Sequence, residues 1–261
     1  LIQMKKKILY IILFLILFLF ISFIIYSEYS EKNFIYILIN NTEIWEKNTK
    51  TWKKVNKNKI KKYESEKVNL FIDSQYRGMA YYTYGIEDNI NLYDEKFNKI
   101  TPTDNLVIIK SNNKYSNGNV VETNDLKTDE NIISVLEKYS LPTSQNLDIN
   151  KYKVDINNDG ESDYLYGISN FFKENENCDK YFSIIFSVIN EQIEIIESKI
   201  VDSNKQLEAN VKYLKSIIDV DKDGDYELII LNTAYSQPNT YCMKKYNTKN
   251  ATFENLIDCE D

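Results

Sequence analysis

Residues 219–227 read DVDKDGDYE and lead without a break into the apolar run LIIL at 228–231. A second stretch of the same design lies upstream, where residues 155–163 read DINNDGESD and are followed by YLY at 164–166. In both copies the run after the acidic loop is rich in β-branched, aliphatic or aromatic residues, and such a run predicts a β-strand. The chain therefore carries one loop-and-strand unit twice.

The spacing of the acidic residues suits a bound cation. Side-chain oxygens at loop positions 1, 3 and 5 converge when the chain curls around a centre, and the glycine at position 6 supplies the positive φ that this turn requires. Several acidic side chains in one short loop repel each other unless a cation neutralises them. Ligands that are all oxygen, in a flexible loop, favour Ca²⁺ over Mg²⁺. The alternative is a pair of polar hairpin turns in which Asp, Asn and Gly serve turn chemistry alone.

The residue at loop position 12 distinguishes an EF-hand loop from other calcium-binding loops. An EF-hand loop requires a glutamate there, whereas this chain has Tyr166 in one copy and Ile230 in the other. An aspartate loop followed by a strand instead resembles the FG-GAP or VCBS repeat of calcium-binding β-propellers and related extracellular β domains. The resemblance covers about residues 147–261, and two copies are too few to close a propeller ring.

The resemblance implies a set of calcium ligands in each loop, from side chains and from the backbone carbonyl at position 7. In the first loop these are Asp155, Asn157, Asp159, Glu161 through its carbonyl, and Asp163. In the second loop they are Asp219, Asp221, Asp223, Asp225 through its carbonyl, and Glu227. Ca²⁺ is therefore the expected cofactor.

Composition limits the chemistry that the chain can perform. The 261 residues are 43% apolar and include 21 tyrosines, which is enough for a buried core and favours strands. Histidine is absent, so Ser-His-Asp, Cys-His and HExxH chemistry are excluded, together with the commonest zinc ligand. We therefore expect a protein that is not an enzyme. A hydrolase based on carboxylates is the catalytic class that stays open.

Three cysteines, Cys178, Cys242 and Cys259, are too few and too scattered for a zinc knuckle or a disulfide scaffold. If a disulfide forms, Cys242 with Cys259 is the preferred pair because both lie near the C-terminus. The alternative is that all three thiols stay reduced.

The N-terminal region predicts a membrane anchor. Residues 8–26 carry no charge and follow three lysines at 5–7. A helix of this length spans about 29 Å, close to the hydrocarbon thickness of a bilayer. The lysines are expected to hold the N-terminus in the cytoplasm, so the rest of the chain lies outside a cell membrane that it crosses once. A cleaved signal peptide is the alternative, although residues 27–30 show no Ala-x-Ala pattern; both interpretations export the remainder.

The charge of the chain limits the kinds of partner that it can bind. The formal net charge is −7, which argues against nucleic acid. Residues 43–67 are locally rich in lysine. This stretch is either a contact for anionic lipids or wall polymers, or a solvated strand face whose lysines protect the edges of a sheet.

One helix is predicted in an otherwise antiparallel β chain. Thr128 is its expected cap, apolar residues at 132, 133, 136 and 139 recur at helical spacing, and Leu141-Pro142 ends it. Strands are predicted at 34–39, 42–46, 51–55, 68–72, 79–84, 90–93, 106–109, 181–189, 192–200, 211–218, 241–246 and 252–257.

Three regions follow from these patterns. Residues 1–30 are the cytoplasmic tail and transmembrane signal-anchor, residues 31–125 a β-rich domain of unknown function, and residues 126–261 the FG-GAP/VCBS-like calcium-loop domain. Together with the resemblance they indicate a membrane-anchored bacterial surface protein, a binding or adhesion module for a protein or glycan partner. A structural envelope protein without a specific ligand is the alternative.

Overall fold

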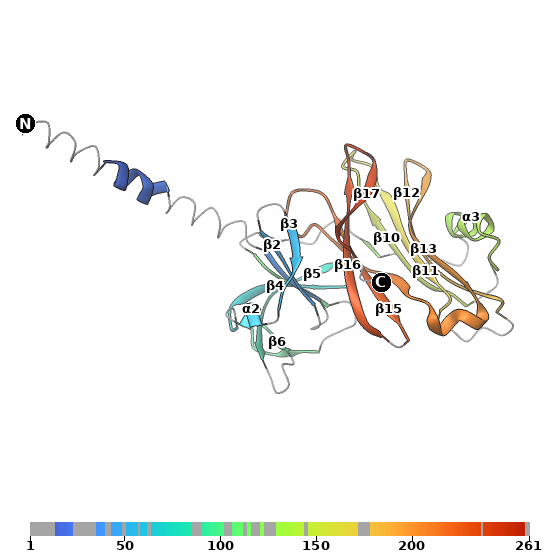
Figure 1. Ribbon diagram of the computed structural model, residues 1–261, viewed down its shortest axis with the longest axis horizontal. Coiled ribbons are helices and arrows are strands. Elements are labelled where there is room, and N and C mark those ends of the chain that lie inside the picture. Colours follow the sequence, from blue (N-terminus) through green and yellow to red (C-terminus); the bar gives the residue numbers. More distant parts are fainter. Residues whose placement is uncertain are drawn as a thin grey trace, which may run out of the picture.

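Three antiparallel β-sheets and a few short helices make up the computed structural model (Figure 1), so the mainly β prediction is confirmed. The structure describes residues 14–22, 35–39, 43–48, 51–56, 58–61, 64–84, 90–101, 106–111, 114–115, 121–122, 129–143, 146–171, 178–235 and 237–258.

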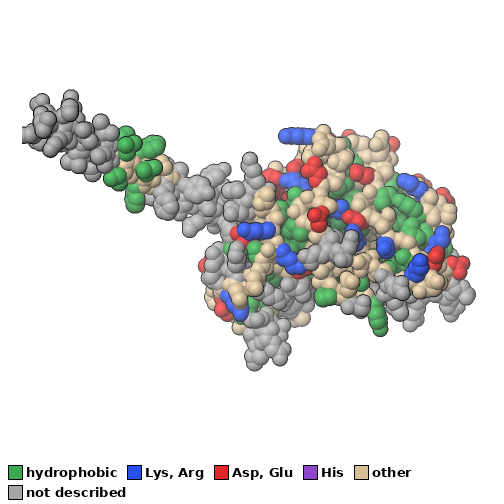
Figure 2. Space-filling view, in the orientation of Figure 1, with side chains coloured by type: hydrophobic (Ala, Val, Ile, Leu, Met, Phe, Trp, Pro, Cys, Tyr) green, Lys and Arg blue, Asp and Glu red, His purple; other side chains and the backbone are tan. Residues whose placement is uncertain are grey.

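An isolated helix precedes the β-sheets. Of the predicted span at 8–26, residues 14–22 are described, and they are helical. Their large apolar side chains, from Phe14 to Ile21, are all exposed and stand apart from the β-sheets (Figure 2). In the described ranges, no helix has both the length and the apolarity that a membrane crossing requires.

The largest sheet, here called the N-terminal sheet, has eight strands. From edge to edge these are β3 (Thr51–Lys54), β2 (Glu43–Asn48), β1 (Ile35–Ile39), β8 (Leu106–Lys110), β4 (Lys67–Ile72), β5 (Gln75–Tyr84), β6 (Ile90–Asp94) and β7 (Lys99–Ile100). The short helix α2 (Asn58–Lys61), which the sequence pattern did not predict, lies between β3 and β4. Strand β1 is buried on both faces because Ile35, Ile37 and Ile39 belong to one core cluster and Tyr36 and Leu38 to another.

Each acidic loop joins the first two strands of a four-stranded meander. The first-loop sheet contains β10 (Asp148–Val154), β11 (Asp163–Ser169), β12 (Lys180–Ile189) and β13 (Gln192–Asp202), with the short β9 (Val121–Glu122) beside β10. The second-loop sheet contains β14 (Val211–Ile218), β15 (Glu227–Ala234), β16 (Gln237–Asn247) and β17 (Thr252–Ile257). The 3₁₀ helix η2 (Ser203–Glu208) connects β13 to β14.

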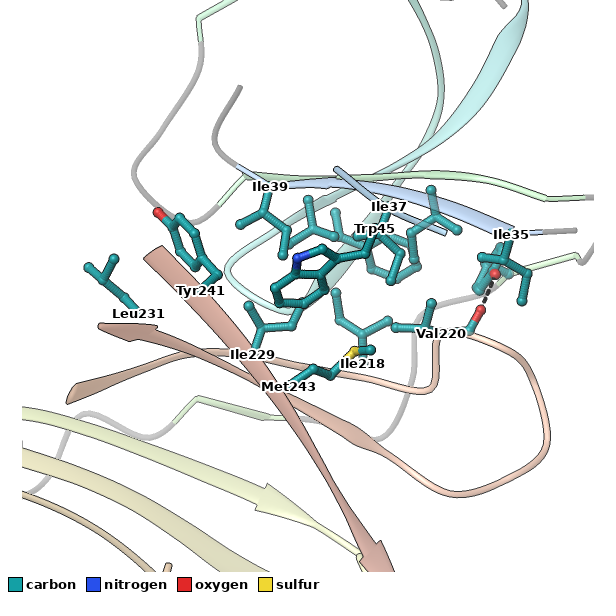
Figure 3. Packing of buried hydrophobic residues seen from close by; sticks show 14 residues of the cluster. Ile35, Ile37, Ile39, Trp45, Ile218, Val220, Ile229, Leu231, Tyr241 and Met243 are labelled. Atoms are coloured by element: carbon teal, nitrogen blue, oxygen red, sulfur yellow. Dashed lines mark hydrogen bonds between the residues drawn. The ribbon is translucent and has the colours of Figure 1, made fainter. Parts of the chain in front are cut away.

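The second-loop sheet lies in the middle of the stack. Leu228 and Ile230 of β15 belong to the core shared with the first-loop sheet, whereas Ile229 and Leu231 belong to the core shared with the N-terminal sheet (Figure 3). Side chains alternate along a strand, so the uninterrupted apolar run at 228–231 is that of a strand covered on both faces. Strand β15 of the central sheet is therefore covered on both faces, in a stack of open sheets that does not close a ring.

Helix α3 (Glu130–Lys138) packs on the outer face of the first-loop sheet through Ile132, Val135 and Leu136. Its N-cap is Asp129, whose carboxylate accepts from the Asn131 N–H. The prediction of Thr128 as the cap is thus corrected by one position, and Thr128 lies outside the described residues. Ile133 was predicted on the apolar stripe but is exposed, because the helical period places it beside the buried face.

The cysteines differ in state. Cys242, on β16, is disulfide-bonded. Cys178 is a buried thiol that donates to the Lys180 carbonyl. Cys259, the predicted partner of Cys242, lies outside the described residues.

Candidate metal centre

The two acidic loops share one backbone conformation. Positive φ occurs at position 4 in both, at Asn158 (59°) and Lys222 (62°), and at position 6 in both, at Gly160 (90°) and Gly224 (97°). Glycine at position 6 is therefore required by the turn, as the spacing predicted. The two loops that repeat in the sequence therefore also repeat the same backbone turn.

The acid at position 9 folds back on the start of each loop. Asp163 Oδ2 accepts from the Ile156 N–H at 3.0 Å, and Glu227 Oε2 accepts from the Val220 N–H at 2.8 Å. Both side chains are buried, with relative exposures of 3% and 0%. In each loop, the position 9 carboxylate is therefore shielded from water and points toward the centre of the loop.

In the second loop, carboxylates converge. Asp219, Asp221 and Glu227 each offer one oxygen, and these three oxygens lie within 4.8 Å of one another. We call these residues the acidic triad. Ca²⁺ binds oxygen at about 2.3–2.6 Å, so oxygens on opposite sides of one ion are up to about 5 Å apart. The spacing of the acidic triad therefore fits a single cation.

Two oxygens of the acidic triad are buried without a hydrogen-bond partner, namely Glu227 Oε1 and Asp219 Oδ1. A buried carboxylate oxygen that lacks a partner is costly, and a metal ion would satisfy it. The arrangement of donors and the unsatisfied oxygens thus both suit a cation.

Burial dominates the electrostatics of the acidic triad. It raises the pKa of Glu227 from 4.5 to about 8, against the opposing effects of the Val220 N–H and of Lys245. It also raises the pKa of Asp219, and the nearby charge of Asp223 adds to that rise. Metal-free Glu227 therefore holds a proton at neutral pH, and a metal ion would displace that proton.

Lysines from two sheets neutralise the second loop. Lys245 of β16 contacts Asp223 and lies 3.3 Å from Asp225 Oδ2 and 3.9 Å from Glu227 Oε1. Lys47 of β2, from the N-terminal sheet, contacts Asp221. Both lysine side chains are largely covered, with 17% and 20% of their surface exposed.

The first loop satisfies its position 1 acid through backbone N–H groups, as the second loop does, and differs from it at position 3. The Asp155 carboxylate accepts from the N–H groups of Asp159 and Gly160 at 3.1 and 2.9 Å. Asn157, which stands where the second loop has Asp221, donates through Nδ2 to Asp159 Oδ2 at 2.7 Å. No group of three carboxylates converges among the described residues 155–163. The first loop is therefore held by its own amide donors, and the pKa of Asp163 is raised by burial and by the charges of Asp159 and Asp155.

The remaining predicted ligands lie at the outer side of the loops. The position 7 N–H groups of Glu161 and Asp225 donate to the position 5 carboxylates Asp159 and Asp223 at 2.8 and 3.0 Å. The two loops also touch, because Asn158 Nδ2 donates to Asp225 Oδ1 at 3.0 Å. Of the ten predicted ligand residues, Asp219, Asp221 and Glu227 are the carboxylates that the structure brings together.

A cavity of about 310 Å³ borders the second loop. Its lining presents polar and apolar surface in similar amounts and consists of Asp225, Lys245, Tyr246, Asn247, Thr248, Lys249, Glu254 and Leu256. Asp225 belongs to the second loop and Lys245 contacts it, so the cavity lies beside that loop.

Sequence patterns did not identify Lys47 and Lys245. Lys47 falls in the basic stretch 43–67, where the described lysines also pair with acids of the same hairpin, such as Lys54 with Glu43 at 3.1 Å. No local spacing distinguishes Lys47 from its neighbours, since its contact depends on the packing of two sheets.

Comparisons with known proteins add no assignment: a scan against protein-family models finds no match, and searches of curated proteins and of solved structures find no similar protein.

Proposed function

We propose that the chain is a calcium-binding β protein whose second loop holds one Ca²⁺ through the acidic triad. The observation that carries this proposal is the fully buried Glu227, whose Oε1 lacks a hydrogen-bond partner. One carboxylate oxygen of Glu227 lies within 4.8 Å of one oxygen each of Asp219 and Asp221. Oxygen-only ligands select a hard ion, and a nine-residue loop with acids of both short and long side chain accommodates Ca²⁺ better than the strict octahedron of Mg²⁺.

The ion would fix the conformation of the second loop at one end of the stacked sheets. It would join the end of β14 to the start of β15 and remove the repulsion among the loop's acids. The resemblance to the FG-GAP or VCBS repeat supports this role. The cavity beside the loop combines charged, aromatic and aliphatic side chains, which suits a group of a protein or glycan partner.

We place the β domain outside the cell, as the exported part of a binding or adhesion module held at the membrane by residues 8–26. Extracellular calcium is sufficient for sites with dissociation constants of about 10⁻⁴ to 10⁻³ M. The disulfide at Cys242 supports an oxidising compartment. A structural envelope protein that uses the ion for rigidity alone is the second candidate, and catalysis is not part of the proposal.

The test is calorimetric titration of the full chain, kept in solution with a mild detergent. Ca²⁺ should bind with a measurable heat that Mg²⁺ does not reproduce. Asp221→Ala should abolish that heat. Asn157→Ala, the matched change at position 3 of the first loop, should leave it largely in place, because that loop lacks a convergent acidic triad. Equal binding by Asp221→Ala and the wild type would refute the assignment.

A further inference from the structure

Lys47 reaches the second loop from a different sheet. It lies on β2 beside Trp52 of β3, and its ammonium is 5.5 Å from the centre of the Trp52 ring. The same ammonium contacts Asp221, a member of the acidic triad. By comparison, Lys245 and Lys222 approach the acidic triad at 3.9 and 4.0 Å, to Glu227 and Asp219. Among the residues that the structure describes, Lys47 is thus the cation in closest contact with the acidic triad.

The packing of the two sheets fixes this contact. Ile37 and Trp45 of the N-terminal sheet pack with Ile229 and Met243 of the second-loop sheet (Figure 3). Next to them the Tyr115 hydroxyl donates to the carbonyl of Val220, the residue before Asp221. The second loop is therefore packed against the N-terminal sheet, on the face of the sheet that carries Lys47.

We propose that Lys47 competes with the metal ion: its ammonium neutralises Asp221 in the metal-free protein, and a divalent cation at the acidic triad must displace it. The inference rests on the proposed function and deepens it, since it names the residue that sets the affinity of the site.

The physical reason is repulsion between like charges. A cation bound by the acidic triad would lie one ligand distance from the carboxylate that Lys47 contacts, and an ammonium and a divalent ion repel strongly at that range in a partly buried site. Binding and the Lys47 contact are consequently antagonistic, and the antagonism is reciprocal. Metal binding should therefore release the Lys47 ammonium from Asp221.

Three variants of the full chain in mild detergent test the competition, with Ca²⁺ affinity measured by calorimetry. Lys47→Met keeps the apolar stem and removes the charge, so the dissociation constant should fall about tenfold or more. Lys47→Arg keeps the charge and should bind close to the wild type. Lys53→Met removes the same charge from the opposite face of the same hairpin, where Lys53 pairs across the strands with Glu46, and it should leave the affinity unchanged.

A second readout uses Tb³⁺ as a probe for the calcium site. Its luminescence, excited through tryptophan, should be sensitised by Trp52 because that ring lies beside Lys47. Lys47→Met should reach half-maximal luminescence at a lower Tb³⁺ concentration than Lys53→Met. Near-ultraviolet circular dichroism in EDTA establishes that both variants are folded.

The outcomes separate the two proposals. Calcium binding by the wild type, with no tightening in a folded Lys47→Met variant, would overturn the competition and leave the metal site standing. Binding by Lys47→Met alone would support the competition, because it would mean that the lysine fills the site in the wild type. No binding by either protein would overturn both proposals.

Discussion

Replacing Glu227 by glutamine tests the metal centre at its most buried ligand. Glutamine has nearly the same shape, and its amide oxygen can still accept from the Val220 N–H, which lies 2.8 Å from Glu227 Oε2. The change removes the negative charge that Glu227 would carry once a metal ion displaces its proton, and it replaces the oxygen that lacks a hydrogen-bond partner by an amide nitrogen. The backbone of the loop should persist while the affinity for a cation falls.

The size of the effect follows from linkage between binding and folding. A ligand that binds the folded state alone stabilises it by RT ln(1 + [L]/Kd), or about 2.7 kcal/mol at a ligand concentration of about 100 times Kd. For a Kd of about 10⁻⁴ M this corresponds to about 10 mM Ca²⁺. In a chain of this size about 1 kcal/mol moves Tm by about 2–4 °C. The wild type should gain roughly 5–10 °C, and Glu227→Gln should lose most of that gain.

The assay is thermal unfolding of the full chain by circular dichroism, in EDTA, in CaCl₂ and in MgCl₂. Glu137→Gln is the matched control because it removes the same charge from the exposed side of α3, and it should keep the calcium-dependent rise in Tm. A Glu227→Gln protein that gains as many degrees in CaCl₂ as the wild type would refute the reasoning about the acidic triad.

Three further predictions concern stability in EDTA, measured by urea titration. The unfolded chain loses the Glu227 proton near pH 4.5, whereas the folded metal-free protein keeps it up to about pH 8. The free energy of unfolding should therefore fall as pH rises through that window, by on the order of 5 kcal/mol. Glu227→Gln should flatten this slope, and an unchanged slope would contradict the raised pKa. Gly224→Ala should cost about 1–2 kcal/mol through backbone strain at its φ of 97°, since no atom would crowd the added Cβ; an unaltered midpoint would contradict the left-handed turn. Ile229→Ala should cost about 2–5 kcal/mol because its side chain is fully buried between two sheets, and a loss below about 1 kcal/mol would show that this packing contributes little.

Local patterns in the sequence determined much of the fold. The glycines at position 6 require positive φ, and Gly160 and Gly224 adopt it. The apolar runs after the loops are strands β11 and β15. These features are encoded within a few residues, since turn chemistry and the alternation of side chains act over that distance. The cap of α3 was predicted at Thr128 but lies at Asp129. Both residue types can cap a helix, and the choice depends on how α3 packs on the first-loop sheet, where Lys151 pairs with Asp129.

Sequence and tertiary structure together decided which acids form the candidate centre, because the first loop has Asn157 where the second loop has the carboxylate of Asp221. The two loops are nearly alike in sequence and conformation, yet the second gathers three carboxylates while the first has Asn157 at position 3, whose side-chain amide donates to Asp159. The burial of Glu227 and the arrival of Lys47 depend on the N-terminal sheet covering the second-loop sheet. Contacts between residues so far apart in the chain arise from the packing of complete apolar faces, and the spacing of residues within one loop carries no information about them.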